Sequence, residues 1–204
     1  LNYISMGINK NECFGLLGPN GSGKSSLLDI LTFSSVPTGG DIYYDGIKNS
    51  DIKEDHFKLG YCPQNDILWE NLTLYEHLKG YLYIRGHSIN NCVTLANEYL
   101  KYCKLEEHKN KYPRELSGGT KRKLCILLAL SSFSDKVILD EPSSGMDPAT
   151  RSYMWEIIMD YINYRKSSII LTTHSMEEAE ILCNRVGILI NGELKAIGSV
   201  NHLK

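Results

Sequence analysis

Short hydrophobic runs alternate along the chain with longer segments in which hydrophobic residues recur every three or four positions. This alternation predicts an α/β fold built around a largely parallel β-sheet. Three of the runs, VILD, SIILTT and VGILI, are almost continuously hydrophobic, as in strands that are covered on both faces. The dipeptides Asp45-Gly46 and Asn191-Gly192 lie between strand-like runs and predict hairpin turns, hence an antiparallel β element. The predicted strands span residues 12–17, 40–44, 59–62, 136–139, 168–172, 186–190 and 193–197.

The middle of the chain, from about Thr73 to Tyr112, shows helical patterning and no strand-like run. Thr73 is followed three residues later by Glu76, which predicts a capping box at the start of one helix. A second helix is predicted over residues 89–103. This part of the chain is therefore expected to be a helical insert in the α/β core.

These patterns predict a single domain over residues 1–204. Its α/β core is assigned to residues 1–66 and 119–204, and a helical subdomain to residues 67–118. Because the chain begins with leucine and ends in the middle of a pattern, it is expected to be part of a longer protein.

Composition narrows the class of protein. Hydrophobic residues make up 42% and charged residues 23%, as in a soluble globular domain. The 24 acidic and 22 basic residues give a net charge of −2, so no nucleic-acid partner is expected. The longest apolar run, 124–130, is far shorter than the roughly 20 residues that cross a bilayer. The six cysteines form no C-x-x-C pair, which argues against a structural metal and indicates a reducing, cytosolic compartment.

A glycine-rich segment, GPNGSGKS at residues 18–25, fits the pattern G-x-x-x-x-G-K-[ST] between an apolar strand and a helix. In such a loop, backbone N–H groups surround phosphates, Lys24 neutralises the β- and γ-oxygens, and the Ser25 hydroxyl binds Mg²⁺. The alternative is a chance match on a glycine-rich turn, and the strand and helix around the loop argue against it. The predicted ATP-binding residues of this loop are Asn20, Gly21, Ser22, Gly23, Lys24, Ser25 and Ser26.

Two carboxylates follow the apolar strand VIL. At the carboxyl end of a strand in an open α/β sheet they would face the ligand crevice. Asp140 is predicted to hold Mg²⁺, directly or through water, and Glu141 to act as the base that polarises the attacking water. Alternatively, both residues simply end the strand before a turn at Pro142.

A further segment, LSGGTKRK at residues 116–123, opens an apolar helix and resembles the signature motif of the ATP-binding-cassette (ABC) ATPases. Gln64 in GYCPQND, the run SGMD at 144–147 and His174 after IILTT follow in the order of that family. The segments ILDEPSSGMDP and IGSVNHLK are similar to the A subfamily of ABC transporters, and most similar to the second of its two nucleotide-binding domains. The sequence departs from the family at Thr120, where glutamine is usual.

The resemblance implies a P-loop NTPase fold with a RecA-like core. It also implies head-to-tail pairing with a second nucleotide-binding domain, each ATP lying between the phosphate loop of one domain and Ser117, Gly118 and Gly119 of the other. A helix that begins with Ser-Gly-Gly presents free N–H groups and a hydroxyl to a phosphate. Ser117 could equally be an ordinary helix N-cap.

Three further roles rest on the resemblance alone. Gln64 would reach the Mg²⁺ or the attacking water, and His174 would contact the γ-phosphate. Asp147 would organise the partner interface, or else simply cap the helix that starts at Pro148. The aromatic residue that stacks on adenine in this family is expected upstream of residue 1.

The implied function is that of an ATP-hydrolysing motor domain, working with transmembrane domains at the cytoplasmic face of a membrane, in a subfamily whose members mostly move lipids. A soluble ABC ATPase acting on ribosomes or DNA is the alternative. A P-loop kinase or GTPase is disfavoured, because the chain has no N-K-x-D motif and the LSGG segment would be unexplained. Residues 65–74, with the apolar side chains of Ile67, Leu68, Trp69 and Leu72, are predicted either to dock on the transmembrane domain or to belong to the core.

Overall fold

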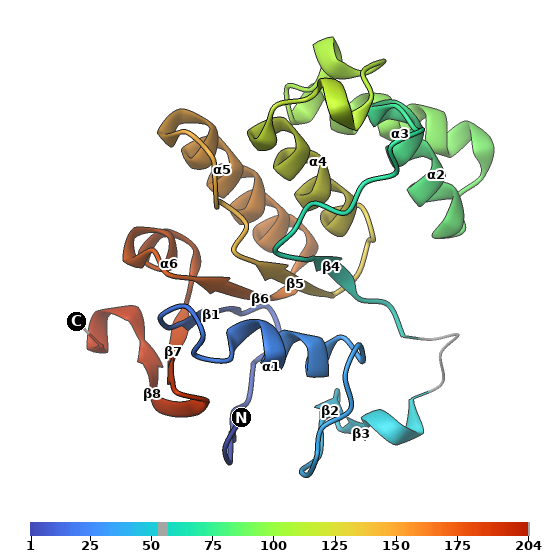
Figure 1. Cartoon of the computed structure of the whole chain (residues 1–204). Helices are drawn as coiled ribbons and strands as arrows, with labels where there is room; N and C mark the ends of the chain where they lie inside the picture. The colour runs from blue at the N-terminus through green and yellow to red at the C-terminus, as the bar shows by residue number, and fades with distance from the viewer. Residues whose placement is uncertain (53–56, 204) are drawn as a thin grey trace.

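A six-stranded β-sheet organises the structure, a computed structural model that describes residues 1–52 and 57–203. Its strands are β1 (Cys13–Leu17), β4 (Gly60–Cys62), β5 (Lys136–Asp140), β6 (Ser168–Thr173), β7 (Arg185–Ile190) and β8 (Glu193–Ser199). They lie in the order β4-β5-β6-β1-β7-β8, and every neighbouring pair is parallel except β7 and β8 (Figure 1). The predicted α/β fold with a largely parallel sheet is therefore confirmed.

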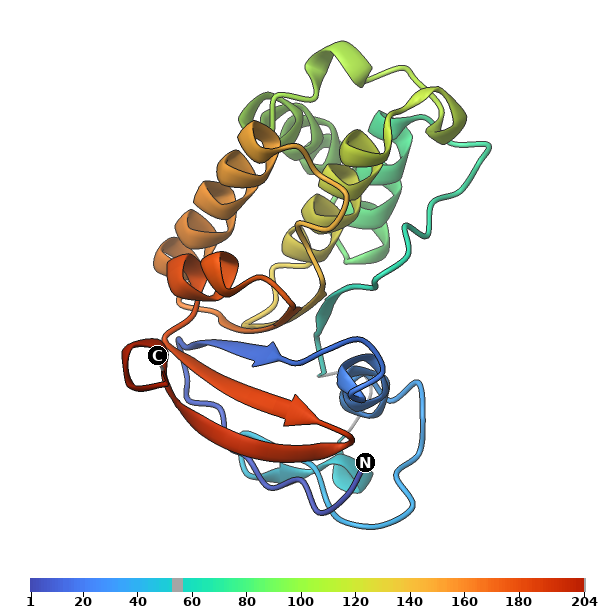
Figure 2. The same cartoon turned by 60° about the vertical axis from the view of Figure 1, so that its left-hand side comes forward.

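Helices cover both faces of this sheet. The α-helices are α1 (Lys24–Leu31), α2 (Leu74–Ile84), α3 (Ile89–Tyr102), α4 (Gly118–Leu130), α5 (Pro148–Arg165) and α6 (Met176–Leu182). The short 3-10 turns are η1 (Asn49–Asp51), η3 (Glu106–His108), η4 (Pro113–Glu115) and η5 (Val200–His202). Helix α1 lies on one face of the sheet, and α4, α5 and α6 lie on the other (Figures 1 and 2).

One large hydrophobic core joins the helical segment to the sheet. Leu78 of α2, Leu100 of α3, Leu124 of α4, Val137 of β5 and Ile158 of α5 all belong to it. A smaller cluster lies under α1 on the opposite face of the sheet. All six cysteines are free and five are buried, so they behave as small hydrophobic residues. Within the described part of the chain, no helix is both long and apolar enough to cross a membrane.

The predicted capping box and both hairpin turns are present. Thr73 and Glu76 cap the start of α2 reciprocally. Asp45-Gly46 and Asn191-Gly192 have positive φ at both positions, as two-residue type I′ hairpins require. One joins β2 (Tyr43–Tyr44) to β3 (Ile47–Lys48) and the other joins β7 to β8.

The predicted strand over residues 40–44 is wrong in its length, because only Tyr43 and Tyr44 form the strand β2. Gly40 has φ +87°, a left-handed conformation that no regular strand contains. The glycine pair in front of Asp41 therefore turns the chain instead of continuing the strand.

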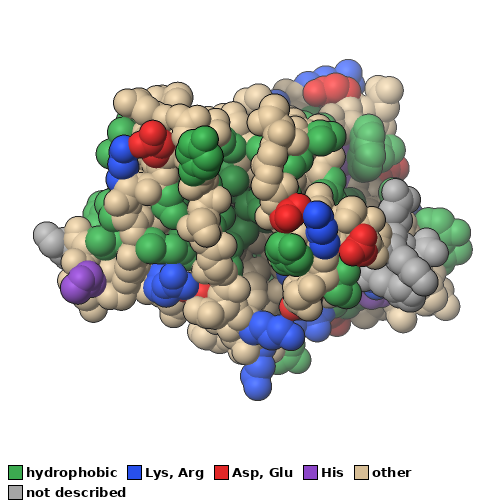
Figure 3. Space-filling view, turned by 90° about the horizontal axis from the view of Figure 1, so that it is seen from below, with side chains coloured by type: hydrophobic (Ala, Val, Ile, Leu, Met, Phe, Trp, Pro, Cys, Tyr) green, Lys and Arg blue, Asp and Glu red, His purple; other side chains and the backbone are tan. Residues whose placement is uncertain are grey.

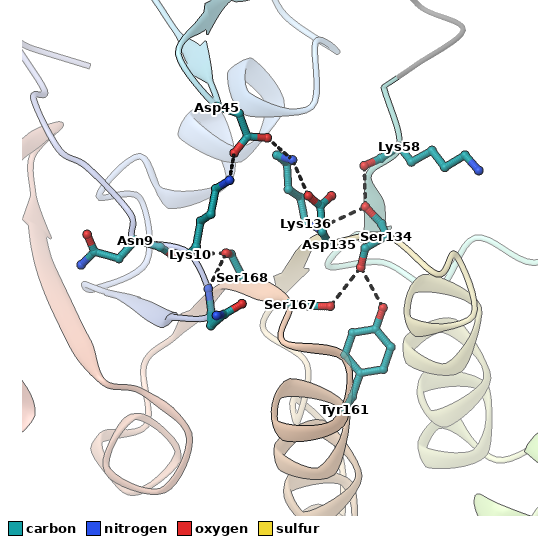
Figure 4. Close-up of polar contacts among 11 residues, drawn as sticks. Asn9, Lys10, Asp45, Lys58, Ser134, Asp135, Lys136, Tyr161, Ser167 and Ser168 are labelled. Atoms are coloured by element: carbon teal, nitrogen blue, oxygen red, sulfur yellow. Dashed lines mark hydrogen bonds and ion pairs between the residues drawn. The ribbon is translucent and has the colours of Figure 1, made fainter.

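A polar network joins the residues at the amino-terminal ends of β5 and β6 (Figure 4). The Ser134 carbonyl accepts from the Tyr161 hydroxyl at 3.0 Å and from the Ser167 hydroxyl at 3.1 Å. Lys136 pairs with Asp45 of the hairpin turn at 2.6 Å, and hydrogen bonding to Lys136 lowers the pKa of Asp45. Figure 3 shows the molecule from below the view of Figure 1. On this face, where α1 lies, basic, acidic and hydrophobic side chains are mixed.

Candidate functional site

The glycine-rich loop connects β1 to α1, and its glycines are needed for two different reasons. A Cβ on Gly18 would lie 2.3 Å from the Leu189 carbonyl oxygen and 2.6 Å from the Ser22 hydroxyl, so the backbone of β7 leaves no room for a side chain. Gly21 and Gly23 have φ values of +77° and +101°, which L-residues rarely adopt. The loop is therefore both tightly packed and sharply curved.

The start of α1 lacks the side-chain cap that the other α-helices have. Its N-cap is Gly23, which offers no side-chain hydrogen bond. The five other α-helices of the described residues begin with a capping side chain, from Thr73, Ser88, Ser117, Asp147 or Ser175. The buried Ser22 hydroxyl also has no hydrogen-bond partner among the described residues. N–H groups left free at a helix start form an anion-binding site.

Lys24 lies at the first position of α1 with only 5% of its surface exposed. Its Nζ donates to the carbonyl oxygens of Gly18 at 2.8 Å and Pro19 at 3.2 Å, within its own loop. It also lies 3.9 Å from Oε1 of Glu141. The ammonium group is therefore held inside the curve of the loop, next to the carboxylate that follows β5.

The two carboxylates after the apolar strand are buried and are organised by Thr172 of β6. The Thr172 hydroxyl donates to Oδ1 of Asp140, the last residue of β5, and accepts from the Glu141 N–H at 2.9 Å. Asp140 is 2% exposed and Glu141 is 8% exposed. Glu141 has φ +49°, an unusual conformation for a residue with a side chain. Sequence reasoning missed Thr172, whose only signal was its place near the end of the run IILTT.

The Glu141 carboxylate lies between Lys24 and His174. Its Oε2 is 3.6 Å from Nδ1 of His174, and its Oε1 faces the Lys24 ammonium. A cavity opens beside it, lined in part by Ser144, Gly145 and Met146. The structure thus brings together three predicted site residues from three separate motifs.

Several other predicted site residues are exposed. The Gln64 side chain is exposed, and its backbone carbonyl accepts from Arg122 at 3.2 Å. Asn20, Gly21, Ser25 and Ser26 are exposed along the phosphate loop and the first turn of α1.

Ser117 and Gly118 are also exposed and Gly119 is half-buried, at the end of α4 remote from α1 (Figures 1 and 2). Both capping alternatives are confirmed. Ser117 accepts from the Thr120 N–H at 3.2 Å, and Asp147 accepts from the Thr150 N–H at 3.0 Å. Hydrogen bonding to Thr150 lowers the pKa of Asp147.

The apolar segment over residues 65–74 divides between surface and core. Ile67 is 76% exposed and Trp69 is 53% exposed, whereas Leu68 packs against the main core. Trp69 and Leu72 line a groove together with residues of α2, among them Ile84. The core alternative is therefore right for Leu68, and docking on the transmembrane domain stays a prediction.

Buried His77 of α2 holds this segment in place. Its Nδ1 donates to the Thr73 carbonyl at 2.8 Å and its Nε2 accepts from the Trp69 N–H at 2.8 Å, so the ring is neutral. Burial lowers the pKa of His77. Protonation would remove the acceptor for Trp69.

The free energy of unfolding is expected to fall as pH decreases below about 6.5, the ordinary histidine pKa. In that range the unfolded chain takes up a proton that native His77 resists, so acid favours unfolding by at most about 1.4 kcal/mol per pH unit. Urea unfolding at pH 7.5 and pH 5.5 measures this change. A His77→Gln variant should show a smaller loss, and an equal loss would contradict the assignment.

Residues 1–144 match the family model described as ABC transporter. The chain belongs to the ABC transporter family. This ABC cassette is 42% identical over 99% of its length to the cholesterol transporter ABCA5 of Rattus norvegicus. It is 46% identical over 98% of its length to ABC transporter A family member 11 of Dictyostelium discoideum. It spans only 12% and 24% of those two relatives.

Solved ABC cassettes share the fold. A dimeric ATP-binding cassette in a post-hydrolysis state, bound to ADP and Pi, matches with a TM-score of 0.87 and 27% identity, over 96% of this chain and 88% of that chain. The ATP-binding subunit of an ABC transporter matches with a TM-score of 0.83 and 30% identity, over 96% and 82%. The predicted P-loop NTPase fold is confirmed. The cassette is an ATPase domain of the ABC type, and a kinase or GTPase is excluded.

Proposed function

We propose that this cassette binds and hydrolyses ATP to drive a membrane transporter. The observation that carries the proposal is the placement of the buried Glu141 carboxylate between Lys24 of the phosphate loop and His174. The proposed base, Glu141, therefore lies next to both the cation that would bind phosphate, Lys24, and a second polar group, His174. That arrangement suits the attack of water on a phosphoryl group.

ATP would lie with its phosphates in the loop between β1 and α1. The uncapped N–H groups at the start of α1 would bind the anion, and the unpartnered Ser22 hydroxyl would offer one more donor. The loop residues Asn20, Gly21, Ser25 and Ser26 complete this cradle. Lys24 would neutralise the β- and γ-oxygens.

Mg²⁺ fits the donors that lie near the phosphates. Ser25 and Asp140 would hold the ion, with Gln64 reaching it or the attacking water, and Thr172 orients the Asp140 carboxylate. The described residues contain no group of three His, Cys, Asp or Glu that could hold a metal. This suits Mg²⁺, which binds through one or two carboxylates together with substrate phosphates and water. Once bound, the ion would neutralise charge on the β- and γ-oxygens.

Glu141 would orient the attacking water and accept its proton. Its carboxylate is buried, so the charge acts with little screening. The side chain of His174, which is 62% exposed, would contact the γ-phosphate.

The signature segment is proposed to bind the ATP of a second nucleotide-binding domain in a head-to-tail dimer. A Cβ on Gly118 or Gly119 would meet no atom of the described residues within 4 Å, so packing against those residues does not explain glycine at either position. An approaching phosphate would explain it, because only glycine exposes both N–H groups fully. Asp147 would lie at the same interface. The similar solved cassette described above is a dimer.

The transported substrate is proposed to be a lipid, moved across a membrane whose cytoplasmic face carries this cassette. The support is the likeness to a cholesterol transporter and to other A-subfamily proteins. We also propose that the cassette divides into a core over 1–66 and 119–204 and a helical subdomain over 67–118. We propose further that it is the second cassette of its protein. These relatives favour a transporter over a soluble ATPase acting on ribosomes or DNA.

Lipid transfer is the test of the proposed function. Proteoliposomes that hold the full-length protein should move labelled cholesterol or phospholipid between leaflets only when ATP is supplied. The same vesicles with the Glu141→Gln variant should move neither. Steady ATP hydrolysis that no lipid accelerates, with no lipid moved, would contradict the transport assignment while leaving the ATPase intact.

The groove lined by Trp69, Leu72 and Ile84 is proposed as the docking surface for the transmembrane domains. Exposed apolar patches of this kind mark interfaces. A cysteine in place of exposed Asn71 should crosslink to a cytoplasmic loop of the membrane domain in the full-length protein. A cysteine in place of exposed Lys195, on β8, is the control and should not crosslink. Equal crosslinking at both positions, or at neither, would count against this surface.

A further inference from the structure

Arg122 is a buried arginine on the inner side of α4, five residues after Ser117. Its side chain is only 4% exposed. Few arginines are buried this deeply unless they are fully paired. The signature segment lies at the start of α4. The partners of Arg122 therefore show which other segments are bound to the first turns of this helix.

One edge of the Arg122 guanidinium binds the segment that follows β4. Nη1 donates to the carbonyl oxygens of Pro63 at 2.5 Å and Gln64 at 3.2 Å, and to Oδ1 of Asp66 at 3.2 Å. Asp66 is the only charged partner of Arg122 among the contacts of the described residues. The backbone of Gln64 is therefore anchored to α4, while its side chain stays exposed.

The other edge binds the segment that follows β5. Nη2 donates to the carbonyl oxygens of Asp140 and Glu141, the latter at 3.2 Å, and Nε donates to that of Pro142 at 3.3 Å. Three consecutive carbonyl groups around Glu141 therefore share one guanidinium. A lysine has no planar fork and could not reach both segments at once.

Glu141 needs such support because of its backbone conformation. A φ of +49° is unfavourable for a residue with a side chain and persists only where the surroundings hold it. Its N–H donates to the Thr172 hydroxyl at 2.9 Å, and its carbonyl accepts from Arg122 at 3.2 Å and from the Ser144 N–H at 3.1 Å. The direction of the Glu141 carboxylate therefore depends on these contacts, of which Arg122 supplies the side-chain one to the carbonyl.

We propose that Arg122 is a positioning residue that sets the Glu141 carboxylate and links it to Gln64 and to the signature segment through α4. The proposal rests on the proposed ATPase function. A shift of the first turns of α4, when Ser117 and the two glycines engage a nucleotide, would reach the hydrolytic carboxylate of the same chain through this one side chain. Occupancy of one ATP site would thereby be linked to hydrolysis at the other.

The test compares Arg122→Lys and Arg122→Gln with Arg165→Gln, which removes an exposed positive charge at the end of α5, outside the signature segment. All are made in the full-length protein. Both Arg122 variants are expected to lower kcat about 10–100-fold, as misplacement of a catalytic group does. The affinity for ATP should change by less than about threefold, because Lys24 and the loop are untouched. Arg165→Gln should keep the wild-type kcat.

A double variant separates positioning from a purely structural role. If Arg122 acts through the Glu141 carboxylate, adding Arg122→Lys to Glu141→Gln should lower the remaining rate by less than about twofold. A loss as large as in the wild-type background would overturn the proposal, as would ATP affinity falling in parallel with kcat. If neither Arg122 variant folds, the same double-variant test is made with Asp66→Asn. This change weakens the ion pair that holds the Arg122 guanidinium, at a partly exposed side chain. If Glu141→Gln itself hydrolyses ATP at the wild-type rate, the proposed function fails instead.

Discussion

Replacing Glu141 by glutamine is expected to stop ATP turnover and leave ATP bound. Glutamine keeps the size of the side chain and can hydrogen-bond to water, but it cannot accept the proton of the attacking water. Loss of a general base lowers a rate about 10²–10⁴-fold, which corresponds to about 3–5 kcal/mol of barrier. Phosphate binding should survive because the loop and Lys24 are unchanged, and it should even tighten as like-charge repulsion near the γ-phosphate is removed.

The Glu141→Gln variant should therefore accumulate as an ATP-bound dimer. Size-exclusion chromatography in Mg-ATP, run beside a phosphate-release assay, reads assembly and turnover together. Wild-type protein should dimerise only transiently under the same conditions. Phosphate release at the wild-type rate by the variant would show that Glu141 is not the base. Lost turnover without dimers would leave the base in place and contradict the head-to-tail assembly.

The sequence was most informative where a local rule determines local structure. Paired dipeptides with positive φ produced both hairpins, and Thr73 with Glu76 produced the capped start of α2. The apolar strands were readable because burial on both faces requires continuous hydrophobic runs. The strand over 40–44 failed because its hydrophobic pattern was too short to outweigh the glycine pair before it.

The candidate site could be predicted as a set of motifs but not as an arrangement. Loop spacing identified Lys24, and the strand end identified Glu141, yet only the parallel order of β5, β6 and β1 brings Lys24, Glu141 and His174 together. Thr172 and Arg122 were missed because each acts through contacts more than 15 residues away in sequence. An arginine within an apolar helix is ambiguous until its burial is known.

Two predicted roles also proved to coincide with ordinary helix capping. Ser117 and Asp147 each accept a hydrogen bond from an N–H three residues on, which is enough to explain serine and aspartate there. The glycines after Ser117 are different, because no contact within the described part of the chain would prevent a side chain at either position. The partner-facing role of the signature segment therefore rests on Gly118 and Gly119 more than on the serine.

Replacing Lys24 by alanine is expected to abolish useful ATP affinity. The ammonium group lies inside the curve of the phosphate loop, 5% exposed, where contacts to phosphate oxygens are little screened by water. A hydrogen bond to a charged group contributes about 1.5–3 kcal/mol, so the loss of two such contacts weakens binding about 10²–10⁴-fold. The fold should persist, since the loop curvature comes from Gly21 and Gly23.

Calorimetric titration of Mg-ATP into wild-type and Lys24→Ala protein measures this loss directly. Lys195→Ala, which removes an exposed lysine on β8, is the matched control and should bind ATP as the wild type does. Urea unfolding of both variants shows whether the loss is specific to the nucleotide. Equal ATP affinities for wild type and Lys24→Ala would refute the phosphate loop itself. Because the proposed roles of Glu141, His174 and Arg122 all refer to a phosphate held in that loop, they would fall with it.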